Sequence, residues 1–208
     1  MGEEDLLKRI RELRKGYVGR TVEKRLEEFR ELGRKPANEI FKELCFCLLT
    51  ANYSAQGGMR IQKSIGDGFL MVPEEGLESE LRRLGHRFPK ARAGYIVEAR
   101  KHIDELPKLM KMSGKDAREW LVGNVKGLGC KEASHFLRNI GFTDVAIVDF
   151  HILDILERNG VIKKPKTLTG KRYTEIENVL MKLGGKLGMN LGELDLCLWY
   201  METGKVLK

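Results

Sequence analysis

The sequence has few cysteines and no long hydrophobic run. No apolar stretch approaches the roughly 18 residues typical of a membrane-spanning helix, and the charged start MGEEDLLKRIRELRKG lacks the apolar core of a secretion signal. These absences argue against a membrane protein and against a disulfide-stabilised secreted protein. They predict an intracellular, cytoplasmic chain whose four cysteines remain thiols. The cysteines are Cys45, Cys47, Cys130 and Cys197.

The cysteine spacing also argues against a metal site. Cys45 and Cys47 lie in the apolar run FKELCFCLLTA. In a helix, side chains two residues apart point about 200° away from each other, which makes a poor chelate. We therefore predict that this pair packs in a core, and the other two cysteines show no ligand spacing.

Positive charge exceeds negative charge in this chain. Its 38 Lys and Arg residues against 30 Asp and Glu residues give a formal net charge of +8 and an isoelectric point near 9.3. Such a surplus favours a polyanionic partner, with nucleic acid ahead of an acidic membrane surface. Solubility alone is the competing explanation, so the charge needs support from a motif.

Helical periodicity dominates the chain. Apolar residues recur at three- and four-residue intervals in nearly every segment, which predicts an all-α fold. Only DVAIVD (144–149) resembles a strand, and it is too short to imply a sheet. Gly141, Gly160 and Gly204 lie where helices are expected to end. The expected helices cover 4–14, 21–33, 41–51, 59–70, 74–85, 90–106, 116–125, 132–141, 149–160, 172–188 and 191–204.

A tight turn, VKGLG (125–129), joins two of these helices. Gly127 and Gly129 supply backbone freedom, and Leu128 between them can enter the groove between the helices. The second helix then begins near Cys130, with its free N–H groups facing outward as a phosphate site. This is the helix-hairpin-helix pattern. A helical turn without a ligand and a non-catalytic DNA-binding module are the alternatives.

Lys131 and Asp149 add chemistry to the hairpin. Asp149 begins the helix expected at 149–160, where a carboxylate accepts N–H groups of the first turn and stays ionised. Breaking an N-glycosidic bond develops positive charge on the sugar, which a carboxylate stabilises. An uncharged Lys amine can attack C1′ and form a Schiff base that permits β-elimination. The pair favours a nucleophilic role for Lys131 over a simple phosphate contact.

The chain resembles the helix-hairpin-helix-GPD superfamily of DNA glycosylases. The resemblance spans nearly the whole sequence and includes LCFCLLTANYSAQ, LGHRFPKARAGYIVEAR, VKGLGCKEASHFL and VAIVDFHI. It implies that Lys131 is the lyase nucleophile, Asp149 the essential aspartate and His151 a phosphate contact. It also implies a monovalent cation, Na⁺ or K⁺, held at the hairpin by the backbone carbonyls of Gly123, Val125 and Leu128.

Within this superfamily, the sequence is most similar to the compact archaeal and thermophile 8-oxoguanine DNA glycosylase/AP lyases. Endonuclease III-like relatives carry a four-cysteine iron–sulfur cluster, but the C-terminal region here has only Cys197, so we expect no cluster and no required cofactor. Phe150 departs from the polar or small residue that relatives often carry after the aspartate, which affects local DNA contacts rather than the chemistry.

The resemblance also implies residues that recognise the damaged base. Lys208 contributes an acceptor for N7–H of 8-oxoguanine through its carboxylate, and Trp199 is the stacking platform. His135 or Phe88 covers the other face of the base, or Phe88 wedges into the duplex. Asn52 and, with less support, Gln56 meet the orphaned partner base. Ordinary packing is the alternative for the aromatic residues and His135, and disorder is the alternative for the C-terminal residue.

The sequence therefore predicts a bifunctional base-excision repair enzyme that excises 8-oxoguanine and cleaves the abasic strand. A glycosylase for oxidised pyrimidines is the alternative enzyme. We expect two helical domains with a DNA cleft between them, formed by 1–34 with 132–208 and by 35–131. The expected partner is double-stranded DNA containing 8-oxoguanine or an abasic site, bound by a monomer without membrane association, in a nucleoid-associated location.

Overall fold

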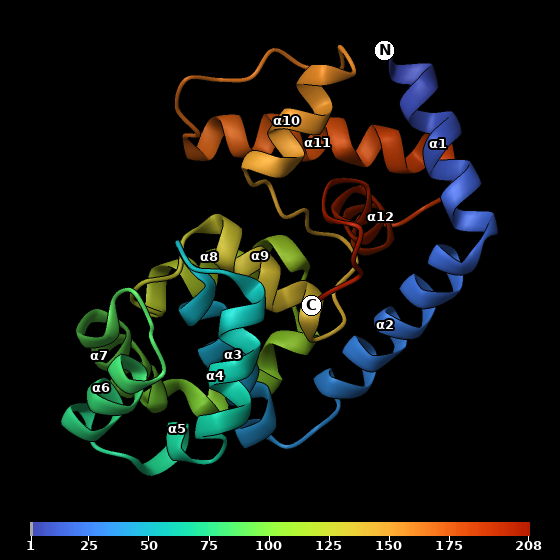
Figure 1. Cartoon of the computed structure of the whole chain (residues 1–208). Helices are drawn as coiled ribbons and strands as arrows, with labels where there is room; N and C mark the ends of the chain where they lie inside the picture. The colour runs from blue at the N-terminus through green and yellow to red at the C-terminus, as the bar shows by residue number, and fades with distance from the viewer. Residues whose placement is uncertain (1) are drawn as a thin grey trace.

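The computed structural model describes residues 2–208 as an assembly of helices (Figure 1). No strand occurs among these residues, and the all-α prediction is confirmed. Within the same range, no helix combines the length and apolarity needed to cross a lipid bilayer. The helices are α1 (Glu3–Lys15), α2 (Tyr17–Gly33), α3 (Ala37–Thr50), α4 (Ala55–Ile65), α5 (Gly68–Met71), α6 (Glu74–Arg83), α7 (Pro89–Ala99), the 3₁₀ helix η1 (Arg100–Lys111), α8 (Gly114–Asn124), α9 (Cys130–Asn139), α10 (Phe150–Arg158), α11 (Gly170–Leu187) and α12 (Leu191–Thr203).

Two separate hydrophobic cores organise these helices. The first contains buried side chains between Ile40 and Val145. The second combines α1 and α2 with buried side chains from Ala146 onward, so the two ends of the chain pack together, as Figure 1 shows for α2 and α12. The buried side chains of α9 belong to the first core, whereas the domain boundary expected from the sequence falls after Lys131. The domain assignment stays a prediction.

Helix α3 forms the centre of the first core because it is apolar on nearly every side. Its residues from Ile40 to Leu49 are fully buried except for Lys42 and the nearly buried Glu43. Cys45 and Cys47 are buried here as predicted, and burial raises the pKa of both thiols well above the usual value. Among residues 2–208, no group of three or more His, Cys, Asp or Glu side chains is arranged to hold a metal ion.

Two expected helices are interrupted in the structure. The helix expected at 59–70 is divided into α4 and α5 at Gly66, which has a positive φ of 52°. The helix expected at 90–106 changes from α to 3₁₀ geometry at Arg100, and Pro107 lies inside the 3₁₀ segment. Proline cannot donate a backbone hydrogen bond, which disfavours a continuous α-helix there. The helix ends predicted at Gly141, Gly160 and Gly204 are confirmed, because all three residues have a positive φ.

The strand-like segment 144–149 has no regular secondary structure. Side chains of α11 satisfy its backbone instead: the Ala146 N–H donates to Glu177 Oε1 at 2.8 Å, and the Val148 N–H donates to the Tyr173 hydroxyl at 3.2 Å. Glu177 also pairs with Arg118 of α8 through two contacts of 2.5 and 2.7 Å. This buried pair connects the first core to the second and holds the segment that leads into Asp149.

Candidate active site

The hairpin between α8 and α9 has the predicted tight geometry. Gly127 has a φ of 90°, and a Cβ atom built there would lie 2.3 Å from Cδ2 of Tyr95. Both the backbone conformation and the close ring therefore require glycine. Leu128 is 6% exposed and joins the first core. Gly129, with a φ of −96°, is the N-cap of α9, a conformation open to other residues.

Lys131 is the second residue of α9. Its side chain is 37% exposed, and its Nζ lies 3.0 Å from Oε1 of Glu132. The N–H groups of a helix's first turn have no partner inside the helix. The hairpin therefore places a reachable amine beside a helix end that can receive a phosphate.

Asp149 is the N-cap residue of α10, as the sequence predicted. Its Oδ1 accepts a hydrogen bond from the Ile152 N–H at 2.9 Å. The side chain is only half-buried, and the Asp149 backbone is extended, as is usual for an N-cap residue. This bond orients the carboxylate and leaves its second oxygen available for another contact.

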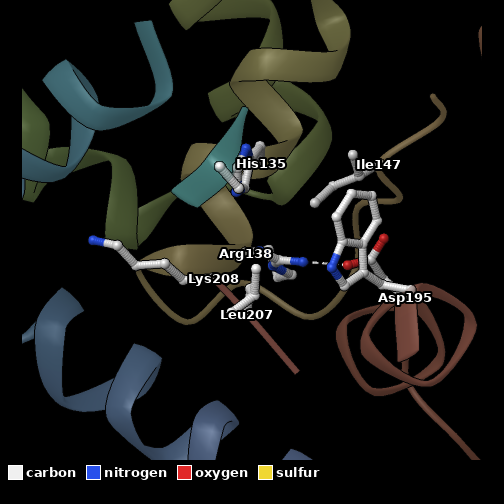
Figure 2. A pocket seen from close by; sticks show the side chains of 8 residues that line it. His135, Arg138, Ile147, Asp195, Leu207 and Lys208 are labelled. Carbon is white, nitrogen blue, oxygen red and sulfur yellow. Dashed lines mark hydrogen bonds and ion pairs between the residues drawn. The ribbon is translucent and has the colours of Figure 1, made fainter. Parts of the chain in front are cut away.

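A pocket beside these groups brings together three of the four predicted base-recognition residues, His135, Trp199 and Lys208 (Figure 2). Lys131 and Asp149 do not line it, although the Lys131 charge acts on His135 and the Asp149 charge acts on Asp195, both of which do. The complete lining consists of Ala55, His135, Arg138, Ile147, Asp195, Trp199, Leu207 and Lys208.

His135 presents an uncharged imidazole to this pocket. Burial lowers its pKa well below the usual value, and the positive charges of Arg138, Lys131 and Lys208 lower it further. A hydrogen bond to the Lys208 backbone acts in the opposite direction. The ring lies edge-on to Phe46 at a centroid distance of 5.5 Å. A neutral imidazole has a flat face, one donor nitrogen and one acceptor nitrogen.

Trp199 of α12 lies beside His151, one of two aromatic residues at the start of α10. It is half-buried, and its ring lies 4.9 Å from the His151 ring at 88°. His151 in turn lies 3.9 Å from the Phe150 ring, which is 61% exposed. These rings place one aromatic surface in the pocket and another in solvent.

Phe88, Asn52 and Gln56 do not line the pocket. Phe88 is 37% exposed at the N-terminal end of α7, with the Arg87 guanidinium 5.0 Å from its ring centre. Asn52 has a φ of 59° in the turn before α4, and Gln56 is exposed in the first turn of that helix. The structure thus leaves Phe88 outside the wall shared by His135 and Trp199, and its part in base binding stays a prediction.

The expected cation would use backbone carbonyls of the hairpin. Val125 is the C-cap of α8, and its carbonyl accepts the Leu128 N–H at 3.2 Å. A carbonyl oxygen has two lone pairs, so this bond leaves one for a cation. The carbonyls of Gly123, Val125 and Leu128 stay a predicted Na⁺ or K⁺ site.

Sequence reasoning missed two charged residues of the pocket wall, Arg138 and Asp195. Arg138 Nη1 pairs with Asp195 Oδ2, and both residues are buried. Helical spacing contained a signal, because Arg138 lies seven residues after Lys131 and Asp195 lies four residues before Trp199. Residues at these spacings share one helix face with the predicted site residues.

Comparisons with known proteins agree with this site. Residues 22–189 match the family model for 8-oxoguanine DNA glycosylase. The 8-oxoguanine DNA glycosylase/AP lyase of Methanocaldococcus jannaschii is 52% identical, over 98% of this chain and 99% of that protein. The protein of the same name from Korarchaeum cryptofilum is 53% identical over 100% of both chains.

A solved structure extends the similarity to three dimensions. The crystal structure of the M. jannaschii glycosylase/lyase, in complex with a 15mer DNA containing 8-oxoguanine, matches with a TM-score of 0.94. The match covers 98% of this chain and 99% of the crystallised one. Together, the hairpin, the pocket and these similarities show that the chain belongs to the 8-oxoguanine DNA glycosylase family.

Proposed function

We propose that this chain is a bifunctional repair enzyme, which removes 8-oxoguanine from duplex DNA and then cleaves the strand at the abasic site. One observation carries the proposal. Lys131 lies one helical turn before His135 on the same face of α9, and His135 lines the pocket. The similar proteins named above support it, since they are 8-oxoguanine DNA glycosylase/AP lyases.

In the proposed reaction, the uncharged amine of Lys131 adds to C1′ while the bond from C1′ to the base breaks. The base leaves with the electrons of that bond and takes up a proton. Asp149 stabilises the positive charge that develops on the sugar. The adduct then loses one proton from nitrogen, and the nitrogen lone pair forms the C1′=N bond as the C1′–O4′ bond breaks and O4′ takes up a proton. The resulting protonated Schiff base acidifies the C2′ hydrogen. Removal of that hydrogen expels the 3′ phosphate by β-elimination.

The pocket would receive the base after it leaves the duplex. Trp199 supplies a stacking surface, and the neutral His135 covers part of the wall. 8-Oxoguanine carries N7–H where guanine has an acceptor, so an oxygen acceptor from the Lys208 main chain would favour the damaged base. A site that pairs with a substrate N–H discriminates strongly against the analogue lacking it.

The exposed groups around the pocket would hold the DNA. Gly127 and Gly129 would allow the N–H groups of α9 to approach a phosphate, and His151 would make a second phosphate contact. Asn52 and Gln56 would face the partner base. In this proposal the reaction needs no cofactor, and the enzyme acts on DNA in the nucleoid.

Borohydride trapping tests the proposal. The parent enzyme should form a covalent adduct with duplex DNA containing 8-oxoguanine, and Lys131→Gln should form none while still binding the DNA. Lys126→Gln is the matched control, because Lys126 lies in the same hairpin and is exposed. If Lys131→Gln still forms the adduct, Lys131 is not the nucleophile. If the parent enzyme is trapped faster on DNA containing an oxidised pyrimidine, 8-oxoguanine is not its preferred substrate.

A further inference from the structure

A cluster of buried polar residues beneath the pocket has no part in the chemistry above. Glu43 is 2% exposed and lies within the otherwise apolar centre of α3. Its Oε2 lies 2.6 Å from Lys208 Nζ, and its Oε1 accepts the Asn139 amide at 2.7 Å. A buried carboxylate is costly unless it is paired and hydrogen-bonded. Its position in the core of α3 therefore calls for a reason beyond packing.

Three side chains contact the Lys208 ammonium group. It donates to Glu43 Oε2 and to Gln62 Oε1, each at 2.6 Å, and lies 4.3 Å from the centre of the Phe46 ring. Gln62 is itself fixed, because its amide donates to the Lys42 carbonyl at 2.8 Å. We name Glu43, Gln62 and Phe46 the lysine clamp. It satisfies the charge and the hydrogen-bond donors of the lysine together.

The other end of the same residue reaches the pocket. Residues 205–208 leave α12 without regular secondary structure and cross from the second core to the first (Figure 1). Lys208 lines the pocket together with His135 (Figure 2), and its backbone acts on the pKa of that imidazole. A segment of this kind is poorly ordered unless side chains hold it in place. The clamp supplies that attachment, because it binds the side chain of Lys208, a residue that lines the pocket.

Glu43 also connects the clamp to Arg138 and Asp195, the two charged residues of the pocket wall. The Asn139 amide that binds Glu43 has a carbonyl oxygen that accepts from Arg138 Nε at 3.1 Å and from Nη2 at 2.8 Å. Arg138 then pairs with Asp195. One continuous network thus joins Lys208, through Glu43 and Asn139, to both charged residues of the pocket wall.

We propose that Glu43 and Gln62 are positioning residues for base recognition, which hold the Lys208 main chain at the pocket wall by gripping its ammonium group. This proposal rests on the proposed function, because it assigns the recognised base to the same pocket. Neither residue touches the base. The clamp determines where the main-chain oxygen of Lys208 lies relative to His135 and Trp199.

Tail variants separate positioning from folding. Lys208→Met removes the gripped charge and keeps the main chain, and Lys205→Met removes an exposed charge from the same tail. We expect Lys208→Met to lower kcat/KM for 8-oxoguanine excision on the order of tenfold to a hundredfold, with cleavage of a preformed abasic site unchanged. Lys205→Met should match the parent, and Lys208→Arg should recover part of the loss. Equal losses on both substrates, or none, would overturn the proposal.

A double-mutant cycle then tests the route. Glu43→Gln should show the same split between substrates, and adding Lys208→Met to it should cause little further loss, because both substitutions release the same grip. Losses that multiply would show independent roles and overturn the clamp. A parent enzyme that cleaves abasic DNA but does not excise 8-oxoguanine would instead reject the proposed function, and the clamp's role with it.

Discussion

The amine of Lys131 lies 3.0 Å from a carboxylate oxygen of its neighbour Glu132. The Glu132 side chain is 14% exposed, so the pair is only partly screened by solvent. An amine needs a free lone pair to attack C1′, so it must leave this contact before it can react. The structure therefore shows the proposed nucleophile in an ion pair that the reaction has to release.

Replacing Glu132 with Gln should speed formation of the covalent adduct. The substitution keeps the size of the side chain and removes its charge. A partly exposed pair contributes about 0.2–1 kcal/mol, so we expect at most about a fivefold faster borohydride trap on abasic DNA near neutral pH. A slower trap would show that Glu132 assists proton removal instead.

Asp149→Asn should separate catalysis from helix capping. Asn caps helices as well as Asp does, so the Ile152 contact and the melting temperature should be retained. Excision should nevertheless fall about 10²- to 10³-fold, because the charge that stabilises the sugar is lost. Asp149→Ala should lose about 1 kcal/mol of stability as well. Near-normal turnover by Asp149→Asn would reject the electrostatic role.

Gly127→Ala should destabilise the hairpin. The positive φ alone costs about 1–3 kcal/mol for a residue with a side chain, and the new Cβ would meet the Tyr95 ring at 2.3 Å. Gly185→Ala is the control, because Gly185 lies in the last turn of α11 and a Cβ there meets nothing within 4 Å. It should gain about 0.4–1 kcal/mol, because alanine restricts the unfolded chain more than glycine does. Urea denaturation of both variants would compare them, and equal stabilities would contradict the predicted strain.

The buried pair of Arg118 and Glu177 should be essential for joining the two cores. The two side chains are 7% and 9% exposed. Glu177→Gln leaves the arginine charge buried without its partner, which costs about 3–5 kcal/mol. The exposed pair of Glu80 and Arg83 offers a matched control, and Glu80→Gln should not change the urea midpoint measurably. A similar midpoint for both variants would show that the buried pair contributes little.

Stability should decrease in mild acid because of buried histidines. Burial lowers the pKa of His135 well below its usual 6.5, and burial also lowers that of His86. Below about pH 6.5 the unfolded chain therefore binds more protons than the folded one, so this contribution is present above that pH and is lost as the pH falls. His135→Gln should reduce the fall in melting temperature between about pH 7.5 and about pH 5.5. An unchanged slope would assign the loss to other groups.

Most helices were predictable because amphipathic periodicity reports which face is buried. The hairpin was predictable for a different reason, since Gly127 adopts a conformation that few other residues tolerate. The breaks at Gly66 and Arg100 were not, because an apolar repeat continues through them and only the backbone turns. Single glycines inside a helical pattern do not by themselves reveal such a break.

The pocket was predictable in part. His135 and Trp199 were named through the family resemblance, and the structure places both in one wall. Arg138, Asp195 and Glu43 were missed because each is a charged residue that becomes buried only through a partner far away in the chain. A single sequence shows such residues as ordinary charges, since their pairing depends on tertiary structure.

The division into two cores has a consequence for the order of folding. All helices of the first core lie within residues 37–145, so that core can form while the rest of the chain is still being synthesised. Helices α1 and α2 are synthesised before the first core, whereas their packing partners α10 to α12 are synthesised after it. We therefore expect α1 and α2 to remain undocked until α10 to α12 have been made, with the pocket closing as these contacts form.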